Sequence, residues 1–127
     1  LLALGLKDVE VWGRGVDDVL FHPSKRSLAL RHRHSLGNAF TFLHVGRLAP
    51  EKGVDVLLAA FAQVEAALGA DHVKLVVAGA GPSLEALRAK AAPNVIFLGN
   101  LDRTRELPAL YASADAFLFA STTETLG

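Results

Sequence analysis

The chain has 127 residues, of which 51% are hydrophobic, and its 13 basic side chains are balanced by 13 acidic ones. This composition is typical of a globular enzyme and excludes a disordered tail or a basic nucleic-acid reader, so any anion-binding site has to be local. The absence of cysteine excludes disulfides and cysteine-ligated zinc and fits a reducing compartment.

The amino-terminal part predicts a short strand followed by a connection. Residues 9–12 form a strand-like run, and the glycines, proline and serine that follow it are typical of a linker. Residues 24–34 then predict one short helix.

From Ala39 onward, strand-like runs alternate with helical patterns. We expect strands at 39–45, 73–78, 94–98 and 115–119, and helices at 54–68, 83–91 and 104–112. The first of these helices has one apolar stripe, predicted to pack on the sheet, that consists of Val54, Leu57, Leu58, Phe61, Val64 and Leu68. The pattern predicts an α/β fold, a Rossmann-like parallel sheet with helices on both faces. Ligands of such sheets bind outside the carboxyl ends of the strands.

The loop GRLAPEKG, residues 46–53, joins the first of these strands to its helix. A helix amino terminus favours an anion, and the loop adds the cations Arg47 and Lys52, which together could hold a diphosphate. The alternative is that both are solvated surface cations paired with Glu51 or Asp55. A P-loop is excluded, because the sequence EKG stands where that motif needs GK followed by Ser or Thr.

The next loop contains Gly79 and Gly81 after a strand, as in a dinucleotide-binding fingerprint. Leu84 occupies the place of the third glycine, and Pro82 removes an N–H donor, so the fingerprint is weak. A tight turn with Pro82 starting a helix is the alternative to a role in lining a ligand cleft.

The last loop places Glu124 among hydroxyl side chains, beyond an apolar strand. A carboxylate there can accept hydrogen bonds from two hydroxyl groups, which suits a sugar, although an isolated Glu in a polar loop is more often plain surface. Among the histidines, His44 lies within an apolar strand and is expected to be a packed core residue. The sequence RHRH at 31–34 is expected to be a solvated basic stretch.

Together, several motifs resemble the nucleotide-binding half of retaining glycosyltransferases of the GT-B fold, family 4. They are GVD followed by FHP, then VGRLAPEKGVDVLLAAF, VVAGAGP, VIFLGNLDRTRELPALYASADAFLF and STTETLG. The match runs from about residue 9 to residue 127, with the motifs in the family's order and spacing. The resemblance implies transfer of a hexose from a UDP- or GDP-linked sugar with retention of configuration and without a required metal.

The resemblance also assigns residues. It implies that Arg47 and Lys52 bind the diphosphate and that Glu124 contacts donor-sugar hydroxyls as the first Glu of an E-x7-E motif. The second Glu would fall beyond Gly127. The further donor-binding positions implied are Gly46, Gly79, Gly81, Pro82, Leu98, Gly99, Leu101, Thr125, Leu126 and Gly127, with Gly15 near the interdomain cleft.

By the same resemblance, residues 1–12 are the end of an acceptor domain, 13–38 an interdomain linker with a short helix, and 39–127 a donor-binding domain incomplete at its carboxyl end. The chain has no methionine and stops without a closing element, so we expect a piece of a longer polypeptide that is inactive alone. The acceptor, a sugar or a lipid, would bind the missing domain. The expected location is the cytoplasm, with contact to the inner face of a membrane through missing parts.

Two other functions stay open from the sequence. One is a nicotinamide-dependent Rossmann enzyme, which Leu84 disfavours. The other is a non-catalytic module that binds a nucleotide or sugar nucleotide.

Overall fold

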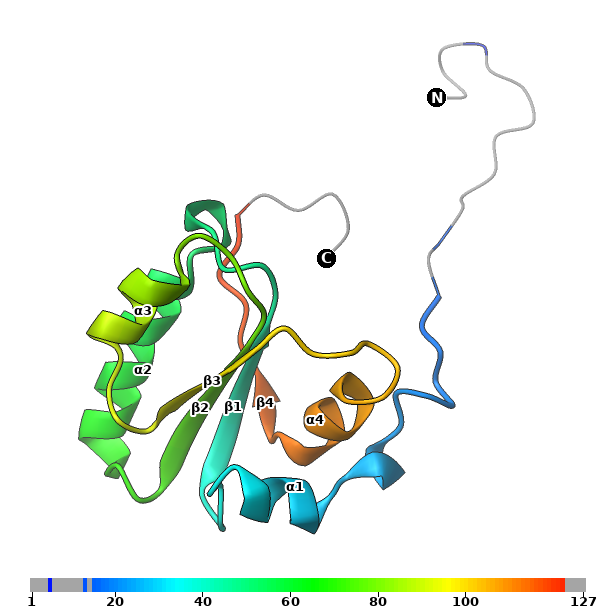
Figure 1. The fold of residues 1–127 in the computed structure, drawn as a ribbon, viewed down its shortest axis with the longest axis horizontal. Coiled ribbons are helices and arrows are strands. Elements are labelled where there is room, and N and C mark those ends of the chain that lie inside the picture. Colours follow the sequence, from blue (N-terminus) through cyan, green and yellow to red (C-terminus); the bar gives the residue numbers. More distant parts are fainter. Residues whose placement is uncertain (1–4, 6–12, 14, 123–127) are drawn as a thin grey trace.

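The computed structural model describes residues 5, 13 and 15–122 (Figure 1). Its strands are β1 (Phe40–Val45), β2 (Val73–Ala78), β3 (Val95–Gly99) and β4 (Ala116–Phe117). Its helices are α1 (Leu28–Arg33), α2 (Val54–Leu68), α3 (Leu84–Lys90) and α4 (Leu107–Ser113), with short 3-10 turns η2 (Pro23–Lys25) and η3 (Pro50–Lys52).

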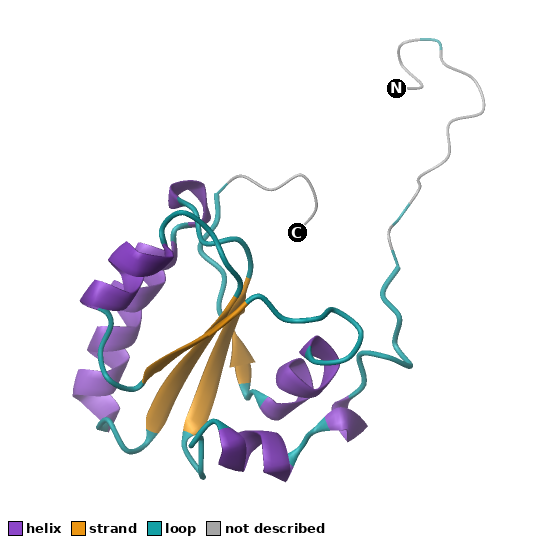
Figure 2. Ribbon diagram, in the orientation of Figure 1, coloured by secondary structure: helices purple, strands orange, loops and turns teal. Residues whose placement is uncertain are grey.

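The strands form one parallel sheet in the order β3-β2-β1-β4. Helices α2 and α3 cover one face, and α1 and α4 cover the other (Figures 1 and 2). The predicted α/β fold with helices on both faces is therefore confirmed. All four strands point their carboxyl ends toward the same edge of the sheet, so the loops after β1, β2 and β3 lie near one another.

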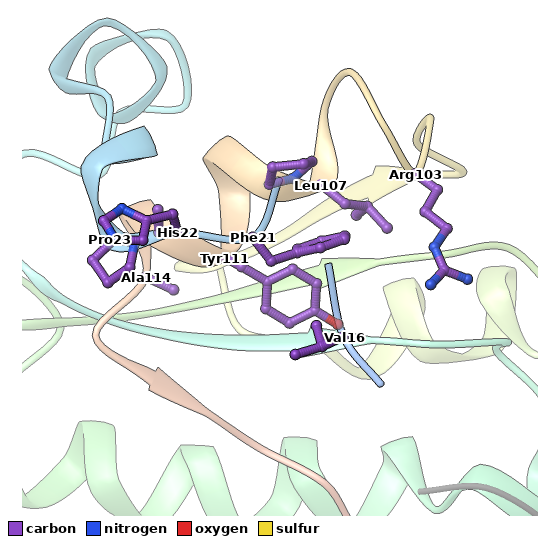
Figure 3. A pocket seen from close by; sticks show the side chains of 10 residues that line it. Val16, Phe21, His22, Pro23, Arg103, Leu107, Tyr111 and Ala114 are labelled. Carbon is purple, nitrogen blue, oxygen red and sulfur yellow. The ribbon is translucent and has the colours of Figure 1, made fainter. Parts of the chain in front are cut away.

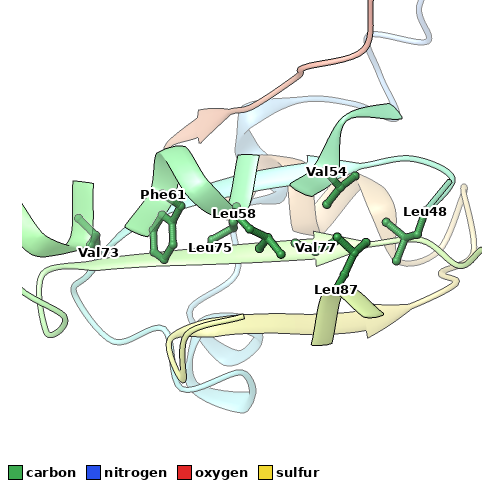
Figure 4. Packing of buried hydrophobic residues seen from close by; sticks show 8 residues of the cluster. All are labelled: Leu48, Val54, Leu58, Phe61, Val73, Leu75, Val77 and Leu87. Atoms are coloured by element: carbon green, nitrogen blue, oxygen red, sulfur yellow. The ribbon is translucent and has the colours of Figure 1, made fainter. Parts of the chain in front are cut away.

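Alternating side chains of β2 enter two hydrophobic cores, which explains why this strand is a continuous apolar run. Val73, Leu75 and Val77 pack toward α2 and α3 (Figure 4). Val76 and Ala78 pack on the opposite face. Four members of the predicted α2 stripe are buried, namely Val54, Leu57, Leu58 and Phe61.

Leu68 does not belong to that stripe as predicted, because it is 57% exposed. It is the last residue of α2, at the amino edge of the sheet, where Phe40 at the start of β1 is also exposed. Val64, one turn earlier, is partly buried against the core.

Two of the predicted helices have other bounds in the structure because of local side-chain hydrogen bonds. The helix expected at 104–112 begins only at Leu107, because the Asp102 carboxylate accepts hydrogen bonds from the amides of Thr104 and Arg105 and folds them into a turn. The helix expected at 24–34 is two pieces, η2 and α1. Between them Ser27 has an extended backbone, and its hydroxyl caps α1 by accepting from the Leu30 amide.

The prediction that RHRH is a solvated stretch is wrong for its first residue. His32 and Arg33 are exposed, but Arg31 is only 5% exposed. Its guanidinium donates to the carbonyl oxygens of Gly37, Ala39 and Ser113, and Nη1 lies 3.6 Å from the Asp115 carboxylate.

Arg26 completes this arrangement from the other side of Asp115, with an ion pair of 3.0 Å. It also donates to the Ala112 and Ala114 carbonyls at the end of α4. We call Arg26, Arg31, Ser113 and Asp115 the Arg31–Asp115 cluster. Its hydrogen bonds and ion pairs connect the segment around α1 to α4 and to the start of β4.

Candidate functional site

The loop after β1 turns sharply before α2 begins. The amides of Lys52 and Gly53 donate to the carbonyls of Ala49 and Pro50, closing η3. Gly53 is in the left-handed region at φ 62°, and a Cβ there would lie 3.0 Å from the Ala120 carbonyl oxygen. Glycine is therefore favoured at this position both by the backbone conformation and by the close contact with the chain after β4.

The loops after β1 and β2 continue the pairing of the two strands. Beyond the sheet, the Gly46 amide donates to Ala78 and the Leu48 amide donates to Ala80, each at 3.0 Å. The Ser83 amide then donates to the Leu48 carbonyl at 2.9 Å. The two loops are thus held together as one rigid unit.

Gly79 and Gly81 make this close approach possible. A Cβ at Gly79 would overlap the Gly46 carbonyl oxygen, and a Cβ at Gly81 would overlap that of Leu48. Gly79 also has φ 133°. These contacts give both glycines a packing function, while a direct contact of either with a ligand stays a prediction.

The third loop joins the same unit, because the Gly79 amide donates to the Gly99 carbonyl at 2.6 Å. The three loops border a hollow of about 400 Å³ at the carboxyl edge of the sheet. Its lining consists of Val45, Gly46, Arg47, Ala78, Gly79, Ala80, Asn100, Leu101 and Leu107.

The hollow brings together Gly46, Arg47, Gly79 and Leu101 from the predicted site. Lys52, Gly81, Pro82, Leu98 and Gly99 do not line it. Sequence reasoning did not single out Asn100 or Leu107. The signal for Asn100 was its amide side chain directly after a strand, whereas Leu107 reads as an ordinary core residue.

The two cations of the first loop differ in exposure. The Arg47 side chain is 67% exposed, and its Nη1 lies 4.0 Å from Glu51 Oε1. This is the pairing that the surface-cation interpretation anticipated, yet an exposed pair at this distance contributes little to stability. Glu51 therefore holds the Arg47 side chain only weakly. Lys52 is half-buried, and its charge helps to lower the pKa of His44.

His44 is a core residue, as predicted, and is 1% exposed. Its Nδ1 lies 3.1 Å from the Leu118 carbonyl oxygen. Because that oxygen only accepts, we assign the proton of the neutral ring to Nδ1, which leaves Nε2 as an acceptor. Nε2 is buried and has no hydrogen-bond partner in the described part of the chain. Burial, followed by the charge of Lys52, holds the pKa of His44 below its ordinary value despite the Leu118 contact.

Several predicted positions stay untested. Glu124, Thr125, Leu126 and Gly127 lie outside the described residues, as does the strand expected at 9–12. Gly15 is exposed, and a Cβ there would meet nothing within 4 Å. The roles of these residues stay predictions.

A second and larger hollow, of about 830 Å³, lies between the segment before η2 and α4 (Figure 3). Apolar and aromatic side chains dominate its wall, and the rings of Phe21 and Tyr111 meet edge to face with centroids 5.8 Å apart. Burial raises the pKa of Tyr111. Leu107 lines both hollows. Apart from it and Arg103, the complete lining is Val16, Phe21, His22, Pro23, Pro108, Tyr111, Ala112 and Ala114.

Within residues 15–122 and the two described glycines before them, no group of three or more His, Asp or Glu side chains could hold a metal ion. None of the helices described is long and apolar enough to cross a membrane.

Residues 39–127, which include β1 to β4 and all three loops, match the sequence model of the family described as glycosyl transferases group 1. The chain belongs to this glycosyltransferase family. The predicted resemblance to glycosyltransferases of the GT-B fold is confirmed, while assignment to family 4 and retention of configuration stay predictions.

Two relatives of this group 1 glycosyltransferase chain are described as GDP-mannose-dependent alpha-mannosyltransferases. The protein from Corynebacterium glutamicum is 39% identical over 122 residues, which cover 95% of this chain and 27% of that protein. The protein from Mycobacterium tuberculosis is 41% identical over 125 residues, which cover 98% of this chain and 31% of that protein. The group 1 chain thus spans less than a third of the length of either relative.

A solved structure has the same fold. The crystal structure of Anabaena Alr3699/HepE in complex with UDP and glucose superposes with a TM-score of 0.70 at 27% sequence identity. The match covers 86% of this group 1 chain and 30% of that chain.

Proposed function

We propose that the chain is the donor-binding part of a glycosyltransferase that moves a hexose from a UDP- or GDP-linked sugar to an acceptor with retention of configuration. The observation that carries the proposal is the gathering of three strand-end loops around one hollow, with Arg47 on its wall and Lys52 at the end of η3, just before α2. Ligands of parallel α/β sheets bind at this edge. The membership of the chain in the family of group 1 glycosyltransferases gives the ligand class.

In this proposal the loop acts on the leaving group. As the bond from the anomeric carbon to the diphosphate breaks, negative charge builds up on the diphosphate oxygens. The amino terminus of α2 and the cations Arg47 and Lys52 stabilise that charge, and because the paired loops fix the backbone, little reorganisation is needed. The two side chains thereby supply the positive charge that a metal ion supplies in many enzymes that act on phosphate groups.

The donor is the least defined part of the proposal. Two relatives near 40% identity are described as GDP-mannose-dependent, whereas Anabaena Alr3699/HepE was crystallised with UDP and glucose. The higher identity of the mannosyltransferases makes GDP-mannose the first donor to test and UDP-glucose the second.

Glu124 has a separate place in the proposal, because its predicted partners are hydroxyl groups of the donor sugar. Glu124→Gln should leave the affinity for GDP or UDP nearly unchanged, since neither ligand carries a hexose, while transfer falls sharply. An ionised carboxylate accepts such hydrogen bonds more strongly than a neutral amide does. Equal losses of nucleotide affinity and transfer would instead place Glu124 at the diphosphate or in the fold.

The principal test is the removal of Lys52 in the full-length protein. Lys52→Ala should weaken GDP or UDP binding about tenfold to a hundredfold, as expected for loss of a hydrogen bond to a charged group worth roughly 1.5–3 kcal/mol. Lys90→Ala, at the exposed end of α3, is the matched control and should bind as the unchanged protein does. If calorimetry finds that Lys52→Ala is folded and binds GDP or UDP as tightly as the unchanged protein, Lys52 is a surface cation with no role in nucleotide binding.

The same measurements separate the other functions. A nicotinamide-dependent enzyme would bind NAD in preference to GDP and UDP, and the packing function of Gly79 and Gly81 removes much of the reason to expect one. A non-catalytic module would bind the nucleotide but never release it from a sugar donor. For the 127-residue chain alone we expect no transfer, and GDP or UDP released by that chain from a sugar donor would contradict this expectation.

A further inference from the structure

A buried imidazole lies directly beneath the loop that carries Arg47 and Lys52. His44 is the last residue but one of β1, and its ring is held from two sides. Nδ1 contacts the Leu118 carbonyl oxygen at 3.1 Å, and the ring stacks on Phe117 with centroids 6.5 Å apart and planes 14° from parallel. The orientation of the ring is therefore fixed.

The other ring nitrogen points at the start of the loop. A Cβ placed on Gly46 would lie 3.3 Å from His44 Nε2, so this atom packs against the underside of Gly46. Most buried polar atoms in proteins have a hydrogen-bond partner. Nε2 has none among residues 15–122. Its lone pair is a site where a proton can be added without moving the ring.

Among the described residues, Lys52 on the first loop is the charged group whose field reaches the His44 ring. Arg47 and Glu51 of the same loop pair with each other. From β2, the neighbour of His44 in the sheet is the apolar Val77. From the chain at and after β4, the contacts are the Phe117 ring and the Leu118 carbonyl.

We propose that His44 takes up one proton at Nε2 when a nucleoside diphosphate binds at residues 46–53. The inference rests on the proposed function. A diphosphate brings negative charge close to Lys52 and Gly46, offsets the lysine field and favours the imidazolium. The proton comes from the buffer and returns to it when the nucleotide leaves, while Nδ1–H keeps its bond to Leu118 throughout.

Such coupling acts in both directions. If the nucleotide raises the proton affinity of His44, protons raise the affinity for the nucleotide by the same factor. Nucleotide binding should therefore strengthen as pH falls below the pKa of His44 in the complex, and the gain should end below the lowered pKa of His44 in the free protein. One proton limits the gain to about tenfold per pH unit.

The test is to count protons by calorimetry of GDP binding to the full-length protein, at pH about 6.5, in two buffers of different ionisation enthalpy. His44→Asn is the informative variant, because its amide nitrogen can replace Nδ1 as donor to Leu118 while Nε2 is deleted. The unchanged protein should take up as much as one proton more than this variant. Protons that bind the phosphates of GDP itself count equally for both. His32→Asn, on the exposed side of α1, should behave as the unchanged protein does.

Equal proton counts in the unchanged protein and His44→Asn, with binding intact, would overturn this inference and leave the proposed function standing. If neither GDP nor UDP binds the unchanged protein, the proposed function fails as well. Should His44→Asn not fold, the ring signal of His44 in the unchanged protein can be titrated by NMR with and without GDP. We expect its pKa to rise with GDP, and an unmoved titration would refute the proposal.

Discussion

The two ends of the parallel sheet use arginine in opposite ways. At the amino end, Arg31 is 5% exposed and its donors are taken up by backbone carbonyls and Asp115. At the carboxyl end, the Arg47 side chain is 67% exposed, and Glu51 stands 4.0 Å away. A guanidinium whose donors are used inside the chain maintains the fold, whereas one whose donors face solvent can serve a ligand.

The buried titratable groups show the same contrast. Arg31 keeps its charge inside the protein because it is paired and hydrogen-bonded. His44, at the other end of β1, has one hydrogen bond among the described residues and a lowered pKa, so it is neutral near pH 7. The guanidinium of Arg31, at the amino end, is always charged. The ring of His44, at the carboxyl end, becomes charged only as pH falls.

The largest expected effect concerns the amino end. Arg31→Ala should lower the free energy of unfolding by about 3–5 kcal/mol, because the Ala39 and Ser113 carbonyl oxygens lose charge-assisted hydrogen bonds and Asp115 keeps only Arg26 as an ion-pair partner. His32→Ala, exposed and next in sequence, should change it by less than about 0.5 kcal/mol. Urea denaturation of both variants measures the difference. A loss for Arg31→Ala as small as that for His32→Ala would refute the structural role of the Arg31–Asp115 cluster.

The next effect concerns the paired loops at the carboxyl end. Gly79→Ala and Gly99→Ala both place an alanine at positive φ, 133° and 73°, but only Gly79 has a neighbour within 4 Å of the added Cβ. Gly79→Ala should therefore cost about 1–3 kcal/mol more, the usual range for overpacking. Thermal or urea unfolding of the pair measures the combined cost of the contact with Gly46 and of the less accessible φ at Gly79. Equal losses of stability would show that the two loops can move apart at little cost in free energy.

A smaller effect is expected from pH. Because the folded pKa of His44 lies below its ordinary value, the unfolded chain binds more protons, and stability falls as pH drops below about 6.5. One proton limits the slope to about 1.4 kcal/mol per pH unit. The loss ends below the folded pKa. His44→Asn should flatten this part of the stability curve, and an identical curve in the variant would show that other groups cause the pH dependence.

The smallest change in stability should come from Arg47. Arg47→Ala should alter the free energy of unfolding by less than about 0.5 kcal/mol, since it removes only an exposed pair. Its affinity for GDP or UDP should nevertheless fall about tenfold or more. A large loss of stability together with the loss of affinity would mean that the contrast with Arg31 does not hold.

The sequence predicted much of the fold because its signals are local and strong. The bounds of α2 and β2 agree with the prediction, since a 15-residue amphipathic helix and a fully apolar strand have few alternatives. The family resemblance and the edge that carries the loops were likewise available from the order of motifs. The late start of α4 was missed because the turn at Asp102 depends on side-chain hydrogen bonds that propensity does not show.

The features that could not be predicted from the sequence depend on contacts between residues far apart in the chain. Arg31 stands in a stretch that looks solvated, and its partner Ser113 is 82 residues away. The close contacts of Gly79 and Gly81 involve the preceding loop, so a glycine pattern alone could not distinguish packing from ligand binding. Arg47 and Lys52 were found from sequence because charge at a helix amino terminus is a local signal. Their contact with a ligand remains to be measured.

The separation of these contacts along the chain also bears on the order of folding. Arg26 and Asp115 are 89 residues apart, and closing so long a loop early in folding carries a large entropy cost. Adjacent units such as β1-α2-β2 can form before it. We expect the Arg31–Asp115 cluster to assemble after the folding transition state, so that its loss speeds unfolding and hardly changes the rate of folding. The segment around α1 would then be the first part of the described chain to separate from the sheet during unfolding and the last to pack on it during folding.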